Sequence, residues 1–395
     1  MHDIHDPGSD RAGPAVRRAE RRGTELLDRI AGAVHVDRVA GSIGAVRITR
    51  PLGELGRARP TARSTRGIDA GLSTPQPGII RVGRGPRAYR YRSSDGAWVS
   101  DPAELERIRR LVIPPGWVDV WISAQPRARV QATGRDRRGR KQYRYHPAFR
   151  RAREVDKYSQ LREFGRVLPR LRRRVDRDLR RRGLPRDKVL ATIVAILEAT
   201  RIRIGNREYA EANHSYGLTT LLPQQVRVEG GSVLFVFRGK SGRRQRLSLH
   251  DPRLARLVAR CRATPGRELF QYETAEGGWQ PVHADDVNAY LREATGADIT
   301  AKAFRTWSAS VLALRLLRDG RQDQATPRSV VGGAIRLVAD ALGNTPAVAR
   351  AAYVHPAVVD WFLGDSPEPE ATGRGAAWLS ADERRLIALL ERDSA

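Results

Sequence analysis

The hydrophobic residues of this 395-residue chain change their spacing near Pro147. Before that point they occur in short runs, such as residues 79–82 and 117–122, separated by Gly, Ser and Asp, which is the pattern of short β-strands and hairpins. After it they recur every three or four residues, as in the stripe from Tyr158 to Leu171, which is typical of amphipathic helices. The sequence therefore predicts an α+β protein in which a β-rich part precedes a mainly helical one.

This change of pattern, together with composition, divides the sequence into four predicted segments. Residues 1–74 mix Arg, Gly and Pro, as poorly ordered basic extensions do. We place the small β-rich domain at residues 75–147 and the larger, mainly helical domain at residues 148–365, followed by a linker and a helix at residues 366–395. With 40% hydrophobic residues, the chain has enough apolar side chains to build cores.

The helical domain is predicted to contain one small antiparallel sheet. Strand-like runs at residues 225–228 and 233–237 flank the turn Glu229-Gly-Gly-Ser232, which is a hairpin signal. From Asp251 onward the spacing is helical to the end of the chain, broken near residues 320–327 and 364–373. After that sheet the sequence thus predicts helices alone.

The chain carries a formal net charge of +28, which is extreme for a globular protein. Such an excess favours a polyanionic partner, with nucleic acid the first candidate and an anionic membrane the second. No apolar run approaches the roughly 20 residues that span a membrane, and the first residues lack the basic and apolar regions of a signal peptide. We therefore expect a soluble protein of the cytoplasm that does not act at a membrane.

The sequence contains few residues arranged to bind a metal ion. A single cysteine, Cys261, excludes an internal disulfide and a cysteine-based zinc cluster, and the 8 His show no spacing typical of metal ligands. No metal or other cofactor is expected.

Lysine is rare in this chain, since 5 of the 72 basic residues are Lys and the other 67 are Arg. One of the few lysines is Lys240, which follows a strand-like run, and another is Lys302, three residues before Arg305. Arginine cannot give up its proton near neutral pH, whereas lysine can. A lysine kept against this bias is therefore a candidate proton donor, although the alternative is a surface base that serves no special purpose.

Four segments of the helical domain carry residues suited to phosphoryl chemistry, and they occur in the order RIGN, SYGLTTL with GKSG, KAFRTW, and LGNTP followed by a tyrosine. Over residues 75 to 360 the chain thereby resembles the type IB DNA topoisomerases of the poxvirus and bacterial kind. The resemblance implies a β-rich domain and a helical catalytic domain that clamp around duplex DNA. It maps the catalytic residues of the family onto Arg203, Lys240, Arg305 and Tyr353.

The resemblance also implies a reaction that needs neither ATP nor a metal. A tyrosine oxygen attacks one backbone phosphate, which gives a 3′-phosphotyrosyl bond and a free 5′-hydroxyl, and the duplex swivels before the strand is resealed. Two guanidinium groups, from Arg203 and Arg305, can hold the charge that builds on the nonbridging oxygens. Lys240 fits the general acid that protonates the leaving 5′-oxygen.

Two positions, Asn344 and Lys302, carry other residues than the histidine that related families have there. Many members of the family have a histidine where this chain has Asn344, nine residues before Tyr353. Asn can still donate a neutral hydrogen bond to a phosphate oxygen but cannot relay a proton, and the alternative is an ordinary helix N-cap. Lys302 replaces the histidine of the HxxR motif of tyrosine recombinases, and we expect it to support phosphate contact or proton transfer unless its role is structural only.

The segment Gly139–Tyr145 of the β-rich domain resembles the DNA-contacting strand of the family. Strand alternation puts Lys141, Tyr143 and Tyr145 on one face, and Gln142 needs a twist or bulge to join them there. These four residues are predicted DNA contacts, Gln142 to base edges in the major groove, and Tyr209 is a fifth. The alternative is a solvated charged hairpin.

We thus expect a monomeric type IB DNA topoisomerase, associated with the nucleoid, that acts on double-stranded DNA without an obligate protein partner. Two other interpretations stay open from the sequence. A site-specific tyrosine recombinase shares the catalytic domain but would need special sites and usually a partner protein. A non-enzymatic basic DNA-binding protein would bind DNA without nicking it.

Overall fold

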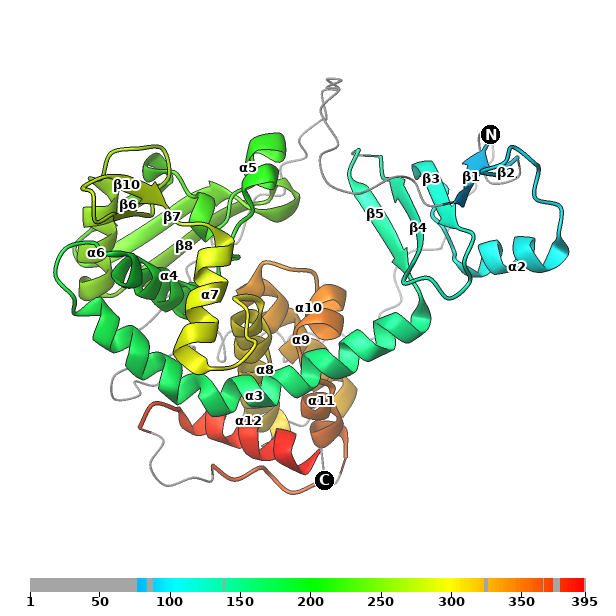
Figure 1. Cartoon of the computed structure of the whole chain (residues 1–395). Helices are drawn as coiled ribbons and strands as arrows, with labels where there is room; N and C mark the ends of the chain where they lie inside the picture. Colours follow the sequence, from blue (N-terminus) through cyan, green and yellow to red (C-terminus); the bar gives the residue numbers. More distant parts are fainter. Residues whose placement is uncertain are drawn as a thin grey trace, which may run out of the picture. The chain divides into compact units, whose positions relative to one another are not determined.

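The computed structural model describes residues 77–83, 88–137, 139–322, 326–364, 366–371 and 377–393 (Figure 1). They separate into two compact units, one ending at Tyr158 and the other running on from Ser159, so that helix α3 (Pro147–Leu179) crosses the division. The predicted basic extension at residues 1–74 lies outside the described residues. Both units combine helices with small antiparallel sheets, so the predicted α+β class is confirmed.

The first unit is built on a five-stranded antiparallel sheet with the order β2-β1-β3-β4-β5. Its elements are β1 (Gly78–Val82), β2 (Arg90–Ser93), α2 (Pro102–Arg110), β3 (Val118–Ser123), β4 (Val130–Arg135) and β5 (Lys141–Tyr145). Register places Ile79 beside Ile122 and Ile122 beside Ala132, so that one face of the sheet forms an apolar row. Ile108 of α2 belongs to the same buried cluster. Strand β5 lies at one edge of the sheet, next to β4.

The second unit is mainly helical and contains a three-stranded antiparallel sheet and a short hairpin (Figure 1). Its helices are α4 (Arg186–Thr200), α5 (Arg207–Asn213), α6 (Pro252–Arg262), α7 (Ala284–Thr295), α8 (Lys302–Asp319), α9 (Pro327–Leu342), α10 (Pro346–Ala352), α11 (Pro356–Leu363) and α12 (Ala381–Arg392). The sheet has the order β6 (Val226–Glu229), β7 (Ser232–Arg238) and β8 (Arg244–His250), and the hairpin is β9 (Gln271–Glu273) with β10 (Trp279–Pro281).

The hairpin β9–β10 corrects the prediction that only helices follow the first sheet. Each of its strands has three residues, which is too few for an alternating pattern to be recognised where the spacing is otherwise helical. The prediction of the β6–β7 hairpin is confirmed, since Glu229 pairs with Ser232 at its turn.

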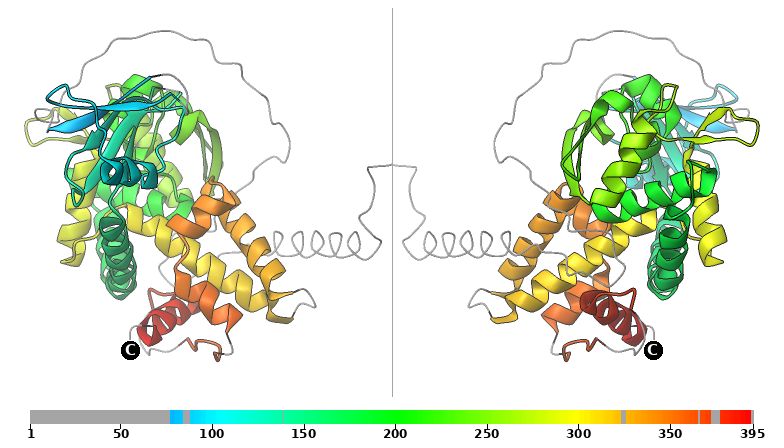
Figure 2. Two further views of the ribbon diagram at one scale, coloured as in Figure 1. Left: turned by 90° about the vertical axis from the view of Figure 1, so that its right-hand side faces the viewer. Right: turned by 90° about the vertical axis from the view of Figure 1, so that its left-hand side faces the viewer.

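Helix α4 runs through the centre of the core of this unit. It is buried on nearly all sides, from Lys188 to Leu197, and it packs on α6, α7, α8 and β8. A helix that is apolar all round fits only such an enclosed position. In both views of Figure 2 the helices α8 to α11, yellow to orange, lie together with α12, in red, beside them. Among the described residues, no helix is long and apolar enough to cross a membrane.

Candidate active site

The loop after α4 carries Arg203 and is held by the SYGLTTL segment. At the end of α4 the chain turns through Arg201, whose φ of 58° is left-handed. Beyond it, Leu218 N donates to Arg203 O at 2.8 Å and Thr219 N to Ile204 O at 2.7 Å. These backbone bonds hold the carbonyls of Arg203 and of the residue after it, so the Arg203 side chain projects from a fixed backbone. The RIGN and SYGLTTL segments, which are separate motifs in the sequence, are therefore hydrogen-bonded to each other in the fold.

Two glycines let these segments approach so closely. A Cβ on Gly217 would lie 2.5 Å from both the N and the Cα of Gly205, which is too close for any side chain. Gly205 itself has a φ of +110°, which L side chains rarely adopt. The glycines of RIGN and SYGLTTL are thus needed for the position of Arg203.

Arg203 and Asn344 are joined directly. Arg203 Nη2 donates a hydrogen bond to Asn344 Oδ1 at 2.8 Å, while Asn344 Nδ2 is buried and has no partner in the described structure. The alternative interpretation of Asn344 as a helix N-cap is wrong, because the N-cap of α10 is Thr345, whose side chain accepts from Val348 N. Asn344 therefore presents an unused donor beside Arg203.

Arg305 is buried on the face of α8 that meets this loop, with 6% of its surface exposed. Its Nη1 donates to the carbonyl of Arg201 and its Nη2 to that of Leu342, the latter at 2.8 Å, while Nε is buried without a partner. Burial lowers the pKa of Arg305 to about 10, and Arg203 adds to this by repulsion. The guanidinium thus stays charged at neutral pH and is short of anionic partners.

Tyr353 follows α10 and lies against Arg305. The guanidinium carbon of Arg305 is 5.1 Å from the centre of the Tyr353 ring. The Tyr353 backbone is held as well, since its N donates to Ala349 O at 3.0 Å and its O accepts from Ser310 Oγ at 3.3 Å. Burial raises the pKa of the phenol, but Arg305 and Arg203 lower the pKa more, so that it lies below the ordinary 10.0. The two cations thus make the phenolate, which is the better nucleophile, easier to form than in an ordinary tyrosine.

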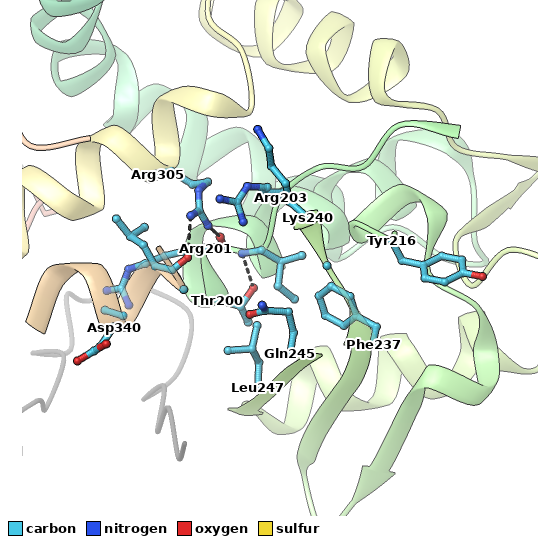
Figure 3. A pocket seen from close by; sticks show the side chains of 15 residues that line it. Thr200, Arg201, Arg203, Tyr216, Phe237, Lys240, Gln245, Leu247, Arg305 and Asp340 are labelled. Atoms are coloured by element: carbon cyan, nitrogen blue, oxygen red, sulfur yellow. Dashed lines mark hydrogen bonds between the residues drawn. The ribbon is translucent and has the colours of Figure 1, made fainter. Parts of the chain in front are cut away.

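Lys240 lies in the turn between β7 and β8, whose backbone is closed by Gly239 N donating to Arg243 O at 2.8 Å. It lines a pocket together with Arg203 and Arg305, and its exposed side chain extends past the two guanidinium groups (Figure 3). Gly343, next to Asn344, lines the same pocket. Four separate segments therefore bring basic groups and a tyrosine to one place.

Lys302 is not brought into this pocket. It is the first residue of α8 and is exposed, about one turn from Arg305. It is absent from the residues that line the pocket with Lys240.

The predicted DNA contacts on β5 divide between the two faces of the sheet. Lys141, Tyr143 and Tyr145 are exposed on one face, as alternation predicted, and the two tyrosine rings stack with centres 6.0 Å apart. Gln142 is half-buried on the other face, where its Nε2 donates to Asp136 Oδ2 at 3.0 Å. The register shift in the β4–β5 pair lies between Val130 and Ala132, opposite the end of β5, and does not turn Gln142 outward.

Tyr209 lies on α5 and is 48% exposed, with its backbone N capped by the Asn206 side chain at 2.8 Å.

Sequence reasoning missed the groups that hold the site together, namely the carbonyls of Arg201 and Leu342 and the hydroxyl of Ser310. Backbone acceptors leave no signature in a sequence, and Ser310 lies inside a helical pattern with no motif that marks it, so no signal pointed to these groups.

Comparison with known proteins covers both units. Residues 146–361 match the family model described as eukaryotic DNA topoisomerase I, catalytic core, and residues 88–136 match that of the bacterial DNA topoisomerase IB, N-terminal domain. The DNA topoisomerase 1B of Acanthamoeba polyphaga mimivirus is 30% identical over 286 residues, which cover 70% of this chain and 85% of the viral protein.

A second relative, the DNA topoisomerase 1 of Mycosarcoma maydis, is 24% identical over 189 residues, 43% of this chain and 18% of that protein. The chain thus spans only a small part of the fungal relative but most of the viral one. Arg203, Lys240, Arg305, Asn344 and Tyr353 all fall within residues 146–361.

Proposed function

Because this chain belongs to the type IB DNA topoisomerases and acts on DNA as an isomerase, we propose that it relaxes supercoiled duplexes with Tyr353 as its nucleophile. One strand is cut when the Tyr353 oxygen bonds to a backbone phosphorus and the bond from that phosphorus to the 5′-oxygen breaks. The duplex swivels about the intact strand, and the 5′-hydroxyl then attacks the phosphotyrosine to reseal the cut. The covalent link conserves the energy of the phosphodiester, so no ATP is needed.

The observation that best supports this proposal is the proximity of Arg305 and Arg203 to Tyr353. Arg305 lies 5.1 Å from the tyrosine ring centre, and both guanidiniums lower the pKa of the phenol. Cations that favour a phenolate before the reaction also favour the extra charge on the phosphoryl oxygens during it. The two arginines therefore stabilise both the Tyr353 phenolate and the phosphate that it attacks.

We assign Asn344 to the same oxyanion. Its Oδ1 is used by Arg203 at 2.8 Å, which turns the amide so that the unpartnered Nδ2 remains for a nonbridging oxygen. A neutral donor of this kind stabilises charge without taking part in proton transfer. Asn344 thus acts as a donor and as the partner that orients Arg203.

Lys240 is assigned as the general acid. Its exposed position in a short turn beside the pocket leaves its ammonium free to meet the 5′-oxygen of a bound duplex. Protonation of that oxygen completes the cleavage, and the resulting amine accepts the proton back during resealing. Lys302, outside the pocket, is proposed to contact a neighbouring phosphate.

DNA binding is proposed to involve both units, which clamp the duplex between them. Lys141, Tyr143 and Tyr145 offer one exposed face of β5 to it, and Tyr209 is a further contact. Gln142 can reach bases only if its bond to Asp136 opens. We further propose that the protein works as a monomer in the cytoplasm, at the nucleoid, without a cofactor or an obligate protein partner.

A plasmid assay tests the proposal. Purified protein is incubated with supercoiled plasmid in EDTA, and wild type is compared with Tyr353→Phe. We expect relaxation by wild type alone, together with a covalent protein–DNA adduct on the 3′ side of the nick. No relaxation by wild type, or equal relaxation by both proteins, would overturn it. Activity confined to plasmids with a particular repeated site would instead indicate a recombinase.

A further inference from the structure

Helix α12 lies beyond the residues that the catalytic-core family model matches, yet it packs on α8, the helix that carries Arg305. Its first turn is closed by a reciprocal cap. Glu383 N donates to Ser380 Oγ at 3.2 Å, and Ser380 N donates to Glu383 Oε2 at 2.8 Å. This cap fixes the carboxylate of Glu383 at the start of the helix.

Glu383 is buried and joins three helices. Arg172 of α3 holds it with two bonds, Nη2 to Oε1 at 2.6 Å and Nη1 to Oε2 at 3.0 Å, and Trp307 Nε1 of α8 donates to Oε1 at 3.0 Å. Burial raises the pKa of Glu383, but Arg172 lowers the pKa by more, so the group stays charged. Arg172 is tied in turn to Glu198 of α4 at 2.7 Å.

The ring of Trp307 is enclosed on its other sides. A Cβ on Gly165 of α3 would lie 2.5 Å from Trp307 Cη2, and the ring of Phe164 is 5.7 Å from that of Trp307. The Trp307 ring is therefore packed closely against α3, so a rotation of α8 would have to displace it. A second link between α8 and α12 is the ion pair of Arg318 with Asp382, the neighbour of Glu383.

Trp307 and Arg305 point to different sides of α8. Residues two positions apart on an α-helix project about 200° apart around its axis. Because Trp307 is held against α3 and α12, Arg305 therefore points to the other side of α8, toward the catalytic pocket. A rotation of about 10° in a helix about 10–12 Å across moves atoms at its surface by about 1 Å. A displacement of that size can cost about 10²-fold in rate.

We propose that Glu383 is a positioning residue of the cleavage reaction, which sets the rotation of α8 through Trp307 and thereby the place of Arg305 against Tyr353. This inference rests on the proposed function. It extends the functional part of the chain past residue 361 to the last helix.

The test compares Glu383→Gln with Glu391→Gln in single-turnover cleavage of a linear duplex. Glu391 is the matched control, since it lies on the same helix and pairs with Arg166 of α3 at 2.7 Å but is 45% exposed. We expect a rate at least about tenfold lower for Glu383→Gln, with DNA affinity unchanged, and a rate within about twofold of wild type for Glu391→Gln. Equal rates for the two variants would overturn the proposal.

A double variant separates positioning from general damage. If Glu383 acts through Arg305, then Glu383→Gln costs nothing further in an Arg305→Ala background, because residues that act as a unit are not additive. A full additional loss in that background would refute the inference. Should Glu383→Gln not fold, Trp307→Phe decides, since it removes the Nε1 donor to Glu383 together with part of the ring that packs on α3: a several-fold loss that is absent in an Arg305→Ala background supports the proposal, and an unchanged rate, or a full additional loss in that background, refutes it. Wild type that cleaves no DNA would instead refute the proposed function.

Discussion

Arg203 Nη2 and Asn344 Oδ1 lie 2.8 Å apart although 141 residues separate them in the chain. The bond uses the acceptor of the amide and leaves its buried Nδ2 donor unpaired. A buried donor without a partner is costly unless a ligand supplies one. The unpaired donor therefore supports the proposal that Asn344, together with Arg203, binds an oxygen of a DNA phosphate.

Replacing Asn344 tests that reading. Asn344→Ala removes both the orienting acceptor and the free donor, and loss of one oxyanion donor typically costs about 10²–10³-fold in rate. We expect single-turnover cleavage to fall by that order while DNA affinity changes little. Thr345→Ala is the control, because it removes the cap of α10 and spares the amide: it should lower the melting temperature and leave the rate nearly unchanged. Equal rates for the two variants would contradict the assignment.

Substitution of Lys240 separates a proton donor from a phosphate-binding charge. Arg keeps the charge but not the ability to release a proton, so Lys240→Arg is expected to lose about 10²–10⁴-fold, almost as much as Lys240→Ala. Both variants should recover on a duplex with a 5′-phosphorothiolate at the cleavage site, because that leaving group needs no proton. Cleavage that stays slow on the modified duplex would deny Lys240 the role of acid.

The pH profile of cleavage reports the phenol. Arg305 and Arg203 hold the pKa of Tyr353 below 10.0. On the 5′-phosphorothiolate duplex, which needs no proton from Lys240, the fraction of phenolate, and with it the rate, should therefore rise with pH and level off at a lower pH than an ordinary tyrosine would give. In Arg305→Gln one stabilising cation is gone and burial remains, so the pKa rises and the plateau moves to higher pH. Arg328→Gln, an exposed change on α9, is the control for net charge. A plateau at the same pH in all three proteins would show that the arginines do not tune Tyr353.

Gly217 tests the support of Arg203. In Gly217→Ala the new methyl would meet the backbone of Gly205 at 2.5 Å, and forcing such overlap typically costs about 1–3 kcal/mol. Thermal unfolding should show this loss, and cleavage should weaken because the Arg203 loop shifts. Gly278→Ala has a nearest neighbour at 3.4 Å, with no backbone atom close by, and should behave like wild type. A Gly217→Ala protein with the melting temperature of wild type would mean that Gly217 does not pack closely against Gly205.

The exposed tyrosines of β5 are expected to act in binding alone. Tyr143→Ala and Tyr145→Ala should each weaken duplex binding several-fold, as the loss of an apolar base or backbone contact does, with the cleavage rate at saturating protein unchanged. Arg109→Ala, on α2 and exposed, controls for loss of a surface group. Binding that is unaffected by the tyrosine changes would favour the interpretation of β5 as a merely solvated strand.

Local pattern was sufficient for much of this protein. Period-2 and helical spacing predicted the two kinds of domain, and alternation predicted the shared face of Lys141, Tyr143 and Tyr145. The motif residues Arg203, Lys240 and Arg305 do line one pocket. The domain types and the shared face depend on neighbours in the chain, whereas the shared pocket was implied by the resemblance to the topoisomerase family.

Other features were decided only by the folded chain. The side chain of Gln142 is bonded to Asp136 across the β4–β5 turn, and Lys302, at the exposed first position of α8, is not among the residues that line the pocket. The strands of β9 and β10 are too short to show a period. The partners of Asn344, Arg305 and Glu383 come from other helices and from backbone carbonyls, and only the packed chain brings such groups within hydrogen-bonding distance.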